Sequence, residues 1–339
     1  MRRIFQLVLS FLFLFQIQSV IASDDIYSFY YNGDSEFILR FNASLKAYAR
    51  NRDAEIEFFD AKNSSSMQLN QIYSSISSKD SLIINLVDPK MASEIIYHAK
   101  SYGNRIVFFN RRPSDEVLKK YDSAWYVGTN SSAAGRYQFE IIHDYLNEIK
   151  GVDRNKDGVL NIVILQGEID HTDTKGRTGQ IKKMLDESKI KYSIVSENYD
   201  NWEASAAFED VKAQVSKVGI KNIDMIIANN DSMAVGAVDY LNTIGYNLGR
   251  EYKDKSKYIP VFGVDGIPKA TEYINQDKMT GTVFADFTAL AKVCVDISLA
   301  DSTDDAELTR KLWYKVTDRK VSIPFVKYAS FKKYAKRSR

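Results

Sequence analysis

The chain has 339 residues, with 46 Lys and Arg against 44 Asp and Glu, 45% hydrophobic residues and a single cysteine. This length predicts two domains, and the apolar and charged fractions exclude a disordered chain, a collagen and a multi-span membrane protein. One cysteine excludes a disulfide framework and a thiolate metal cluster. The formal charge of +2 gives no reason to expect a nucleic-acid partner.

Residues 1–22 have the pattern of a cleavable secretory signal peptide. Two arginines open the chain, residues 7–15 are nearly all apolar, and Val20 and Ala22 are the small residues of a cleavage site. The apolar stretch is shorter than the roughly 20 residues that a spanning helix needs, which disfavours an uncleaved anchor. We therefore expect an exported chain of 317 residues (339 − 22) with 44 residues of each charge.

Short β-branched or aromatic runs alternate with stretches of helical apolar spacing along the rest of the chain. Fully apolar strands between amphipathic helices predict parallel sheets that are covered on both faces. Such units are too many for one sheet, so we expect an α/β protein with two lobes. The expected strands are residues 56–59, 82–86, 106–109, 162–165, 192–195, 225–228 and 259–262, and the clearest helical spacing lies at residues 37–48 and 181–185.

Polar side chains follow several of the expected strands. In open α/β sheets, ligands bind beyond the carboxyl ends of the strands. Carboxylates, amides, a guanidinium and an imidazole at these ends suit a neutral polyhydroxyl ligand, whose hydroxyls both donate and accept hydrogen bonds. The candidate residues are Asn110, His171, Asp173, Arg177, Asn230 and Asp265.

Helix capping is the competing interpretation of these residues. Asp231 precedes an apolar helical pattern, and we expect it to cap that helix. For Asn110, Asn230 and Asp265 taken singly, capping and ligand binding both stay open. Their recurrence at several strand ends favours ligand binding.

Signatures of common enzyme classes are absent from the sequence. It has no Walker-type phosphate loop, no Gly-x-Ser-x-Gly and no His-Glu-x-x-His. Cys294 lies in an apolar helical pattern with no histidine near it, which predicts a small buried side chain rather than a nucleophile. We therefore expect a protein without catalytic residues.

Residues 153–161 match the first nine positions of an EF-hand calcium loop. Oxygen-bearing side chains stand at positions 1, 3, 5 and 9, and a glycine stands at position 6. Position 12 is Ile164, in an expected strand, so the usual bidentate Glu is missing. Either a distant carboxylate completes a structural calcium site, or the segment is a polar turn that binds no metal. The candidate ligands are Asp153, Asn155, Asp157, the carbonyl of Val159, and Asn161.

Six short motifs follow one another along the chain. They are Phe108-Phe109-Asn110 with Pro113, residues 126–129, the 153–161 loop, Gly167-Glu168 with His171, Asp173, Arg177 and Thr178, residues 227–231, and residues 261–265. In this order they resemble the periplasmic galactose/glucose-binding proteins of bacterial ABC sugar transport, which have the type I periplasmic substrate-binding fold. The resemblance runs from about Asn32 to Lys333.

The resemblance implies two α/β lobes, each a mostly parallel sheet flanked by helices, joined by a hinge of three crossovers. The crossovers would lie near residues 128–131, 284–287 and 321–325. The N-terminal lobe would comprise residues 23–128 and 287–321, and the C-terminal lobe residues 131–284 and 325–339.

The resemblance also assigns roles to single residues. The sugar would be held by polar contacts and sandwiched between two aromatic rings, whose negative faces suit the slightly positive C–H groups of a pyranose. Asp224 stands where the family has the Glu that completes the calcium loop. The implied sugar contacts are Asp34, Phe37, Asn110, His171, Asp173, Arg177, Trp202, Asn230 and Asp265.

Three positions depart from the family pattern. Asp34 lies three residues before Phe37 rather than two, so either Asp34 reaches the sugar by a local shift or Ser35 replaces it. Ala285 stands where the family has an Asn that bonds a sugar hydroxyl, and losing such a partner costs about 1–3 kcal/mol. Asp224 is one methylene shorter than Glu. These departures leave the fold unaffected but put the identity of the ligand in question.

The function that the resemblance implies is capture of glucose or galactose in the periplasm and delivery to the permease of an ABC importer. The protein would be a monomer with structural calcium, and a chemoreceptor is a further candidate partner. One alternative is a divergent paralogue that binds another small ligand or acts as a sensor. Another is a glycoside-processing enzyme, which would need two carboxylates across the scissile bond, drawn from Asp34, Asp173 and Asp265.

Overall fold

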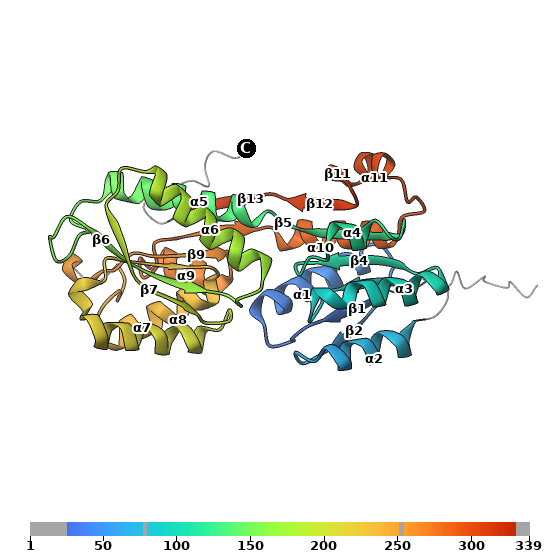
Figure 1. Ribbon diagram of the computed structural model, residues 1–339, viewed down its shortest axis with the longest axis horizontal. Coiled ribbons are helices and arrows are strands. Elements are labelled where there is room, and N and C mark those ends of the chain that lie inside the picture. Colours follow the sequence, from blue (N-terminus) through green and yellow to red (C-terminus); the bar gives the residue numbers. More distant parts are fainter. Residues whose placement is uncertain (1–25, 77–79, 251–253, 330–339) are drawn as a thin grey trace, which may run out of the picture.

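The computed structural model describes residues 26–76, 80–250 and 254–329. They form two lobes that lie end to end along the long axis of the molecule, each a sheet with helices on its faces (Figure 1). The expected signal peptide and residues 330–339 lie outside the described residues. Within the described ranges, no helix has the length and apolarity to span a membrane.

The first lobe contains a seven-stranded sheet in the order β11-β12-β5-β4-β3-β1-β2, in which only the β11–β12 pair is antiparallel. Its strands are β1 (Ile26–Tyr30), β2 (Ile56–Asp60), β3 (Ser81–Ile84), β4 (Arg105–Phe109), β5 (Ala124–Thr129), β11 (Val316–Thr317) and β12 (Lys320–Ile323). Its helices are α1 (Glu36–Arg50), α2 (Ser65–Ser75), α3 (Ala92–Tyr102), α4 (Asp115–Leu118), α10 (Phe287–Ser298) and α11 (Asp305–Leu312), with the 3₁₀ turn η1 (Pro89–Met91).

The second lobe contains a six-stranded sheet in the order β13-β10-β9-β8-β6-β7, in which only the β10–β13 pair is antiparallel. Its strands are β6 (Leu160–Gln166), β7 (Tyr192–Tyr199), β8 (Met225–Ala228), β9 (Val261–Asp265), β10 (Gly281–Ala285) and β13 (Phe325–Ala329). Its helices are α5 (Ser131–Glu148), α6 (Thr172–Glu187), α7 (Ala204–Val218), α8 (Asp231–Thr243) and α9 (Pro268–Asn275), with the 3₁₀ turns η2 (Ile220–Asn222) and η3 (Lys255–Lys257).

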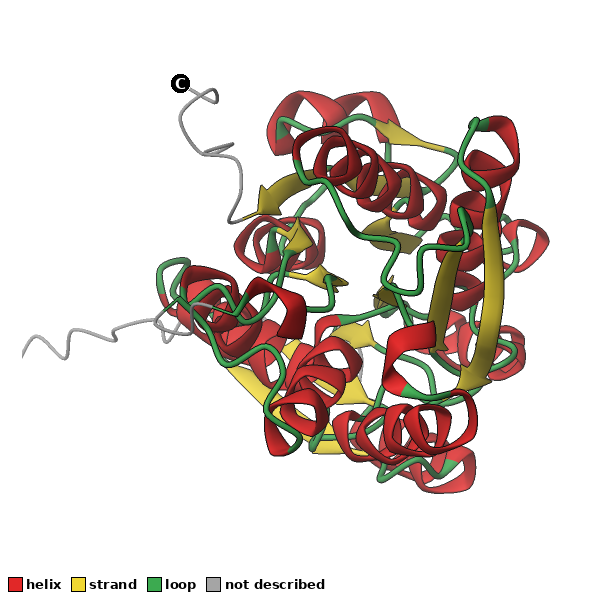
Figure 2. Cartoon of the chain, turned by 90° about the vertical axis from the view of Figure 1, so that its left-hand side faces the viewer, coloured by secondary structure: helices red, strands yellow, loops and turns green. Residues whose placement is uncertain are grey.

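Both sheets are mostly parallel and lie inside a layer of helices (Figure 2). This arrangement confirms the fold class predicted from the sequence. Apolar strands form the interior of each lobe: every residue of β3 and of β8 is buried. Burial on both faces is why these strands read as continuous apolar runs rather than as alternating ones.

The chain passes from one sheet to the other three times. The first two passages run through Asn130 and Asp286, whose side chains accept the N–H groups of Ala133 and Ala289 and so cap α5 and α10 at 2.9 Å each. The third runs through Pro324, which separates β12 from β13 and has no N–H to offer a ladder. The lobe boundaries that the resemblance implies stay a prediction.

All seven expected strands are present, with ends that shift by at most four residues, and residues 225–228 keep both ends. Periodicity did not predict β1, because the fully buried Ser28 interrupts its apolar run. The short strands β11 to β13 also carry exposed or half-buried positions, such as Val326 and Lys327, and give a weak pattern. Cys294 lies in α10 and is fully buried, as predicted, and this burial raises the pKa of its thiol.

Candidate ligand-binding cleft

A cleft of about 370 Å³, its open mouth included, lies between the two lobes. Residues that follow β1, β4, β6, β7 and β8 meet there, together with the last residue of β9, as the rule for parallel sheets predicts. Eight of the nine residues expected to contact a ligand line the cleft, and Asp34 does not. The lining residues are Tyr31, Ser35, Phe37, Asn110 and Arg111 from the first lobe, and His171, Asp173, Arg177, Trp202, Asn230 and Asp265 from the second.

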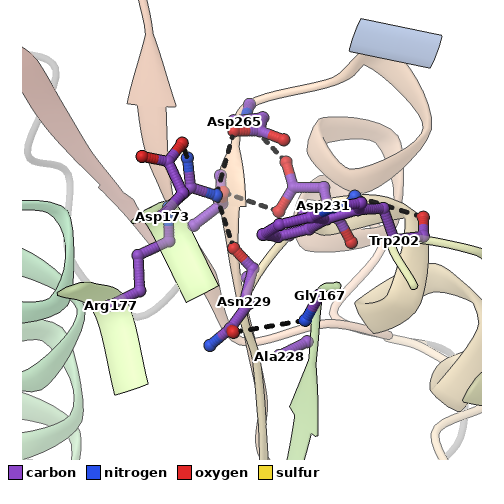
Figure 3. Close-up of polar contacts among 12 residues, drawn as sticks. Gly167, Asp173, Arg177, Trp202, Ala228, Asn229, Asp231 and Asp265 are labelled. Carbon is purple, nitrogen blue, oxygen red and sulfur yellow. Dashed lines mark hydrogen bonds and ion pairs between the residues drawn. The ribbon is translucent and has the colours of Figure 1, made fainter. Parts of the chain in front are cut away.

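Arg177 is the centre of the polar network in the second lobe (Figure 3). Its Nη2 donates to Asp173 Oδ2 at 2.9 Å, one helical turn away on α6, and its Nη1 donates to the carbonyl of Asn229 at 2.6 Å. Nη1 also lies 3.5 Å from Asp265 Oδ1. The guanidinium is buried, and it fixes both carboxylates on one side of the cleft. Hydrogen-bond acceptors are thereby held in place without freedom to turn toward solvent.

Asp265 lies in a strained turn at the end of β9. Its φ is +117° and that of Gly266 is +74°. Burial raises the pKa of Asp265 to about 7, although nearby Arg177 opposes the shift. A carboxyl group with such a pKa can accept or donate a hydrogen bond near neutral pH.

His171 is the N-cap residue of α6 and lines the cleft. Its Nδ1 accepts the N–H of Asp173 at 3.1 Å, so the helix is capped by an imidazole rather than by a carboxylate. Burial lowers the pKa of His171 to about 4, so the ring is neutral at physiological pH. Because Nδ1 accepts, the ring proton is on Nε2, which makes His171 a hydrogen-bond donor to a bound molecule.

Two aromatic rings line the cleft from opposite lobes. Phe37, in the first turn of α1, packs on Phe287 with ring centroids 5.2 Å apart. Trp202, at φ +70°, lies edge-on to His171 at 5.1 Å. Its ring covers Gly167, where an added Cβ would lie 2.1 Å from the indole, so a glycine is required there. Phe37 and Trp202 are therefore suited to stack on the two apolar faces of a ring-shaped ligand.

Asn230 both caps α8 and lines the cleft. Its Oδ1 accepts the N–H of Met233 at 3.0 Å. The prediction that Asp231 caps this helix is therefore wrong. Asp231 is instead the first residue of α8, and its buried carboxylate accepts the N–H groups of Gly266 and Ile267 at 2.6 and 3.0 Å. Asp231 holds the turn that carries Asp265, and burial, with Asp265 nearby, raises its pKa.

Two of the positions that depart from the family pattern, Asp34 and Ala285, do not line the cleft. Asp34 is exposed and lies outside the cleft, whereas Ser35 lines it. Ala285 is buried in β10 and is not among the lining residues. Asn110 lines the cleft at φ +57°, held by a hydrogen bond from Asn85 Nδ2 to its Oδ1 at 3.0 Å.

Sequence reasoning missed two lining residues, Tyr31 and Arg111. Tyr31 directly follows β1, a strand that periodicity did not predict. Arg111 follows Asn110, and the strand-end rule that found Asn110 could have found it. Its guanidinium lies over the Tyr31 ring, 4.1 Å from the centroid.

The 153–161 loop lies apart from the cleft. Asp153 accepts the N–H groups of Lys156 and Gly158 at 2.7 and 2.8 Å, so its carboxylate closes the turn of the loop. Asp224, the residue directly before β8, accepts the N–H groups of Arg154 and Asn161 at 2.7 Å each. Asp224 therefore ties the two ends of the loop together. Among the described residues, no three Asp, Glu, His or Cys side chains converge as a metal site of those groups would require.

Two lobes with a polar and aromatic cleft between them define a solute-binding protein of the periplasmic type. Residues 26–301 match the periplasmic binding protein domain family, and the chain belongs to this family. It is 34% identical, over 79% of its length and 77% of the relative's, to the D-galactose/methyl-galactoside binding periplasmic protein MglB of Haemophilus influenzae. The recognition made from the motifs is confirmed.

Solved structures share this fold. An ABC transporter solute binding protein from Bacillus halodurans with bound myo-inositol has a TM-score of 0.69 at 23% identity and covers 91% of this chain and 96% of its own. A periplasmic solute binding protein from Actinobacillus succinogenes with bound D-allose has a TM-score of 0.71 at 20% identity and covers 91% and 98%. At these identities the likeness establishes the fold alone.

Proposed function

We propose that this chain is a periplasmic sugar-binding protein that captures a neutral aldohexose, glucose or galactose, and delivers it to an ABC importer. The observation that carries the proposal is the cleft itself. It combines an aromatic ring from each lobe with the buried Asp173 and Arg177 and the partly buried His171. Neutral polyols need this mixture, because each hydroxyl both donates and accepts.

Closure of the lobes would couple sugar binding to recognition by the membrane complex. The cleft residues come from both lobes, so a sugar contacts all of them only when the lobes are together. The permease subunits would then read the closed form, and a chemoreceptor is a further candidate reader of it. We propose that the carrier is monomeric and is exported by means of the expected signal peptide.

A binding role agrees better with the carboxylates than a glycoside-processing one. Asp173 and Asp265 both contact the single guanidinium of Arg177, so they lie on one side of the cleft rather than across a substrate bond. Asp34, the third candidate for an acid–base pair, is exposed and lies outside the cleft. We therefore propose no catalytic residue.

Isothermal titration calorimetry on the mature chain tests the sugar proposal. D-glucose and D-galactose should bind with 1:1 stoichiometry, and D-xylose, D-ribose and myo-inositol should bind more weakly. Absence of heat with every aldose would overturn the proposal. Exclusive binding of a pentose or of inositol would favour the divergent paralogue, for which Ser35 and Ala285 already argue.

We also propose that the 153–161 loop binds calcium. The donor set is all oxygen, from Asp153, Asn155, Asp157, the Val159 carbonyl, Asn161 and Asp224, which is the chemistry that calcium prefers. Asp224 already ties the ends of the loop together through hydrogen bonds, so the gain in stability on binding should be small. Thermal melts in calcium and in EDTA test this. An unchanged melting temperature up to millimolar calcium would contradict it.

A further inference from the structure

Three buried acceptor oxygens between β7 and α7 have no hydrogen-bond donor among the described residues. They are Asp200 Oδ2, Asp210 Oδ2 and Gln214 Oε1. Asp200 directly follows β7 and is 4% exposed, whereas Gln214 lies in α7 and is 8% exposed. Buried oxygens without a partner are unfavourable, so a donor or a cation should satisfy them.

The fold brings the three side chains to one edge of the second sheet. Asn198 Nδ2 donates to Asp210 Oδ1 at 2.6 Å, which joins the edge strand β7 to α7. Gln214 Nε2 donates to the same oxygen at 3.2 Å and holds its amide beside that carboxylate. Asp200 lies two residues after Asn198, and its N–H donates to the carbonyl of Gln166 at 2.8 Å, so the strand pairing continues to it. Alternation along an extended chain places Asn198 and Asp200 on the side that faces α7.

The two carboxylates of this cluster have no cationic partner. No ion pair among the described residues includes Asp200 or Asp210. Burial, with the charge of Asp210 nearby, raises the pKa of Asp200 to about 7. The other close carboxylate pair of this lobe, Asp173 and Asp265, shares the guanidinium of Arg177. A compensating positive charge is therefore present in the cleft and lacking between β7 and α7.

A proton cannot satisfy all three oxygens. One proton on the carboxyl pair supplies a single O–H donor, which leaves Gln214 Oε1 without a partner. One water molecule supplies two donors and no positive charge. A cation can contact all three oxygens and neutralise both carboxylates at once. Carboxylate and amide oxygens are the ligands that hard cations such as calcium prefer.

We propose that Asp200, Asp210 and Gln214 form a cation site, separate from the 153–161 loop, that binds calcium or another hard divalent cation. The inference does not depend on the proposed sugar function. Three protein oxygens are fewer than the roughly six to eight that calcium takes, so water molecules would complete the coordination. We therefore expect a weak site, with a dissociation constant of roughly 10⁻⁴–10⁻³ M.

A cation in this place would stabilise the turn that leads from β7 to α7. Glu203 N–H donates to the carbonyl of Asp200 at 2.9 Å, so Asp200 begins the turn. Asn201 and Trp202 inside it have φ of +52° and +70°, a backbone conformation that is unfavourable for residues other than glycine. Fixing the Asp200 and Asp210 side chains to one ion would offset part of that cost by holding both ends of the connection.

Terbium luminescence provides the test, because terbium replaces calcium and emits when a nearby tryptophan is excited. Trp202 lies two residues from Asp200, whereas Trp125 and Trp313 belong to the first lobe. The mature parent should give tryptophan-sensitised emission that excess calcium removes. Asp210→Asn and Gln214→Leu keep the size of the side chain and remove one ligand oxygen or one charge. Each should weaken terbium binding about tenfold, since affinity follows the charge and number of the ligands.

Two variants serve as controls. Asp239→Asn changes a half-buried carboxylate of α8 that accepts the Tyr273 hydroxyl at 2.5 Å, and it should keep the emission. Asp157→Asn removes a candidate ligand of the 153–161 loop and should also keep it. Urea unfolding adds a readout that loss of a hydrogen bond alone would not give. In EDTA, Asp210→Asn should be at least as stable as the parent, because it removes the repulsion with Asp200, and in calcium it should be less stable.

The outcomes decide the inference independently of sugar binding. Absence of tryptophan-sensitised emission from the parent would overturn the site and leave a proton as the compensating charge. Emission that survives in Asp210→Asn, or that disappears in Asp157→Asn instead, would place the terbium elsewhere and overturn it as well. Sugar calorimetry is a separate measurement, so failure of the sugar proposal would leave these results unchanged.

Discussion

The two walls of the cleft are built in different ways. The second-lobe wall is a network of buried charges, in which Arg177 contacts Asp173 and Asp265 (Figure 3). The first-lobe wall has no carboxylate: it offers the rings of Tyr31 and Phe37, the neutral Ser35 and Asn110, and the guanidinium of Arg111, with Ser35 where the family pattern has a carboxylate. A charged network tolerates few changes because every member depends on its partners. We therefore expect the second wall to provide recognition common to many sugars and the first wall to decide which one binds.

The strongest test of this division is Arg177→Met in the second wall. Removal of the guanidinium leaves Asp173 and Asp265 without their shared partner, and breaking a buried pair in this way costs about 3–5 kcal/mol. We expect a much lower urea midpoint and no detectable sugar binding. Arg136→Met, at an exposed pair with Glu140, should cost only about 0.5 kcal/mol. Equal losses in both variants would contradict the special role of the network.

The next effect concerns Trp202, the aromatic residue of the second wall. Trp202→Ala should lower sugar affinity roughly thirtyfold, or about 2 kcal/mol, through lost stacking and apolar burial. Calorimetry with the tightest-binding aldohexose measures it. The control is Trp313→Ala, because Trp313 is 89% exposed and far from the lining residues in sequence. A Trp202→Ala protein that binds as well as the parent would remove the stacking interpretation.

A substitution in the first wall should have a smaller effect. It should change which sugar the protein prefers rather than whether it binds sugars at all. Ser35→Asp returns a carboxylate to the position two before Phe37, which lines the cleft. One added hydrogen-bond acceptor is worth about 1 kcal/mol, so we expect the affinity for glucose or galactose to rise about fivefold. Ser66→Asp, on the exposed surface of α2, is the matched control. If Ser35→Asp weakens all sugars alike, the first wall does not select among them.

A further effect, in metal-free buffer, is a pH dependence at Asp200, two residues before Trp202 in the chain. Burial raises the pKa of Asp200 to about 7, with Asp210 adding to the shift, whereas an unfolded Asp titrates near 3.9. Between these values the folded state holds a proton that the unfolded state has lost, so this group's contribution to stability falls as pH rises from about 4 to 7. Urea unfolding of Asp200→Asn across this range should show a less negative slope of unfolding free energy with pH than the parent. An unchanged slope would contradict the shift.

Much of the fold was predictable from local pattern. Strands buried on both faces, such as β4 and β6, are continuous apolar runs, and their ends locate the cleft because parallel strands place their carboxyl ends at one edge. Strands at the edges, such as β13, are half exposed and give no such pattern. The same rule found Asn110 and Asp265 but not Tyr31, because the strand before Tyr31 was not predicted.

Which of two adjacent polar residues caps a helix was not predictable from sequence. Asn230 and Asp231 are both good caps, and the structure uses Asn230. The choice follows from a distant contact: Asp231 bonds the backbone of Gly266 and Ile267 on the neighbouring strand's turn. Similarly, Ser35 rather than Asp34 lines the cleft. Ser35 is the N-cap residue of α1, so the start of this helix places it beside Phe37 at the cleft.

The length of the chain and its alternation of strand and helix patterns were enough to predict an α/β protein of two lobes, and the order of its motifs was enough to place it in its family. The strand and helix patterns and each motif extend over only a few consecutive residues. At that range, the type of side chain determines burial and backbone preference. The pairing of Arg111 with Glu168 depended on the tertiary structure alone, since 57 residues and two sheets separate them. No local pattern encodes such a contact, because it forms only where the two lobes meet.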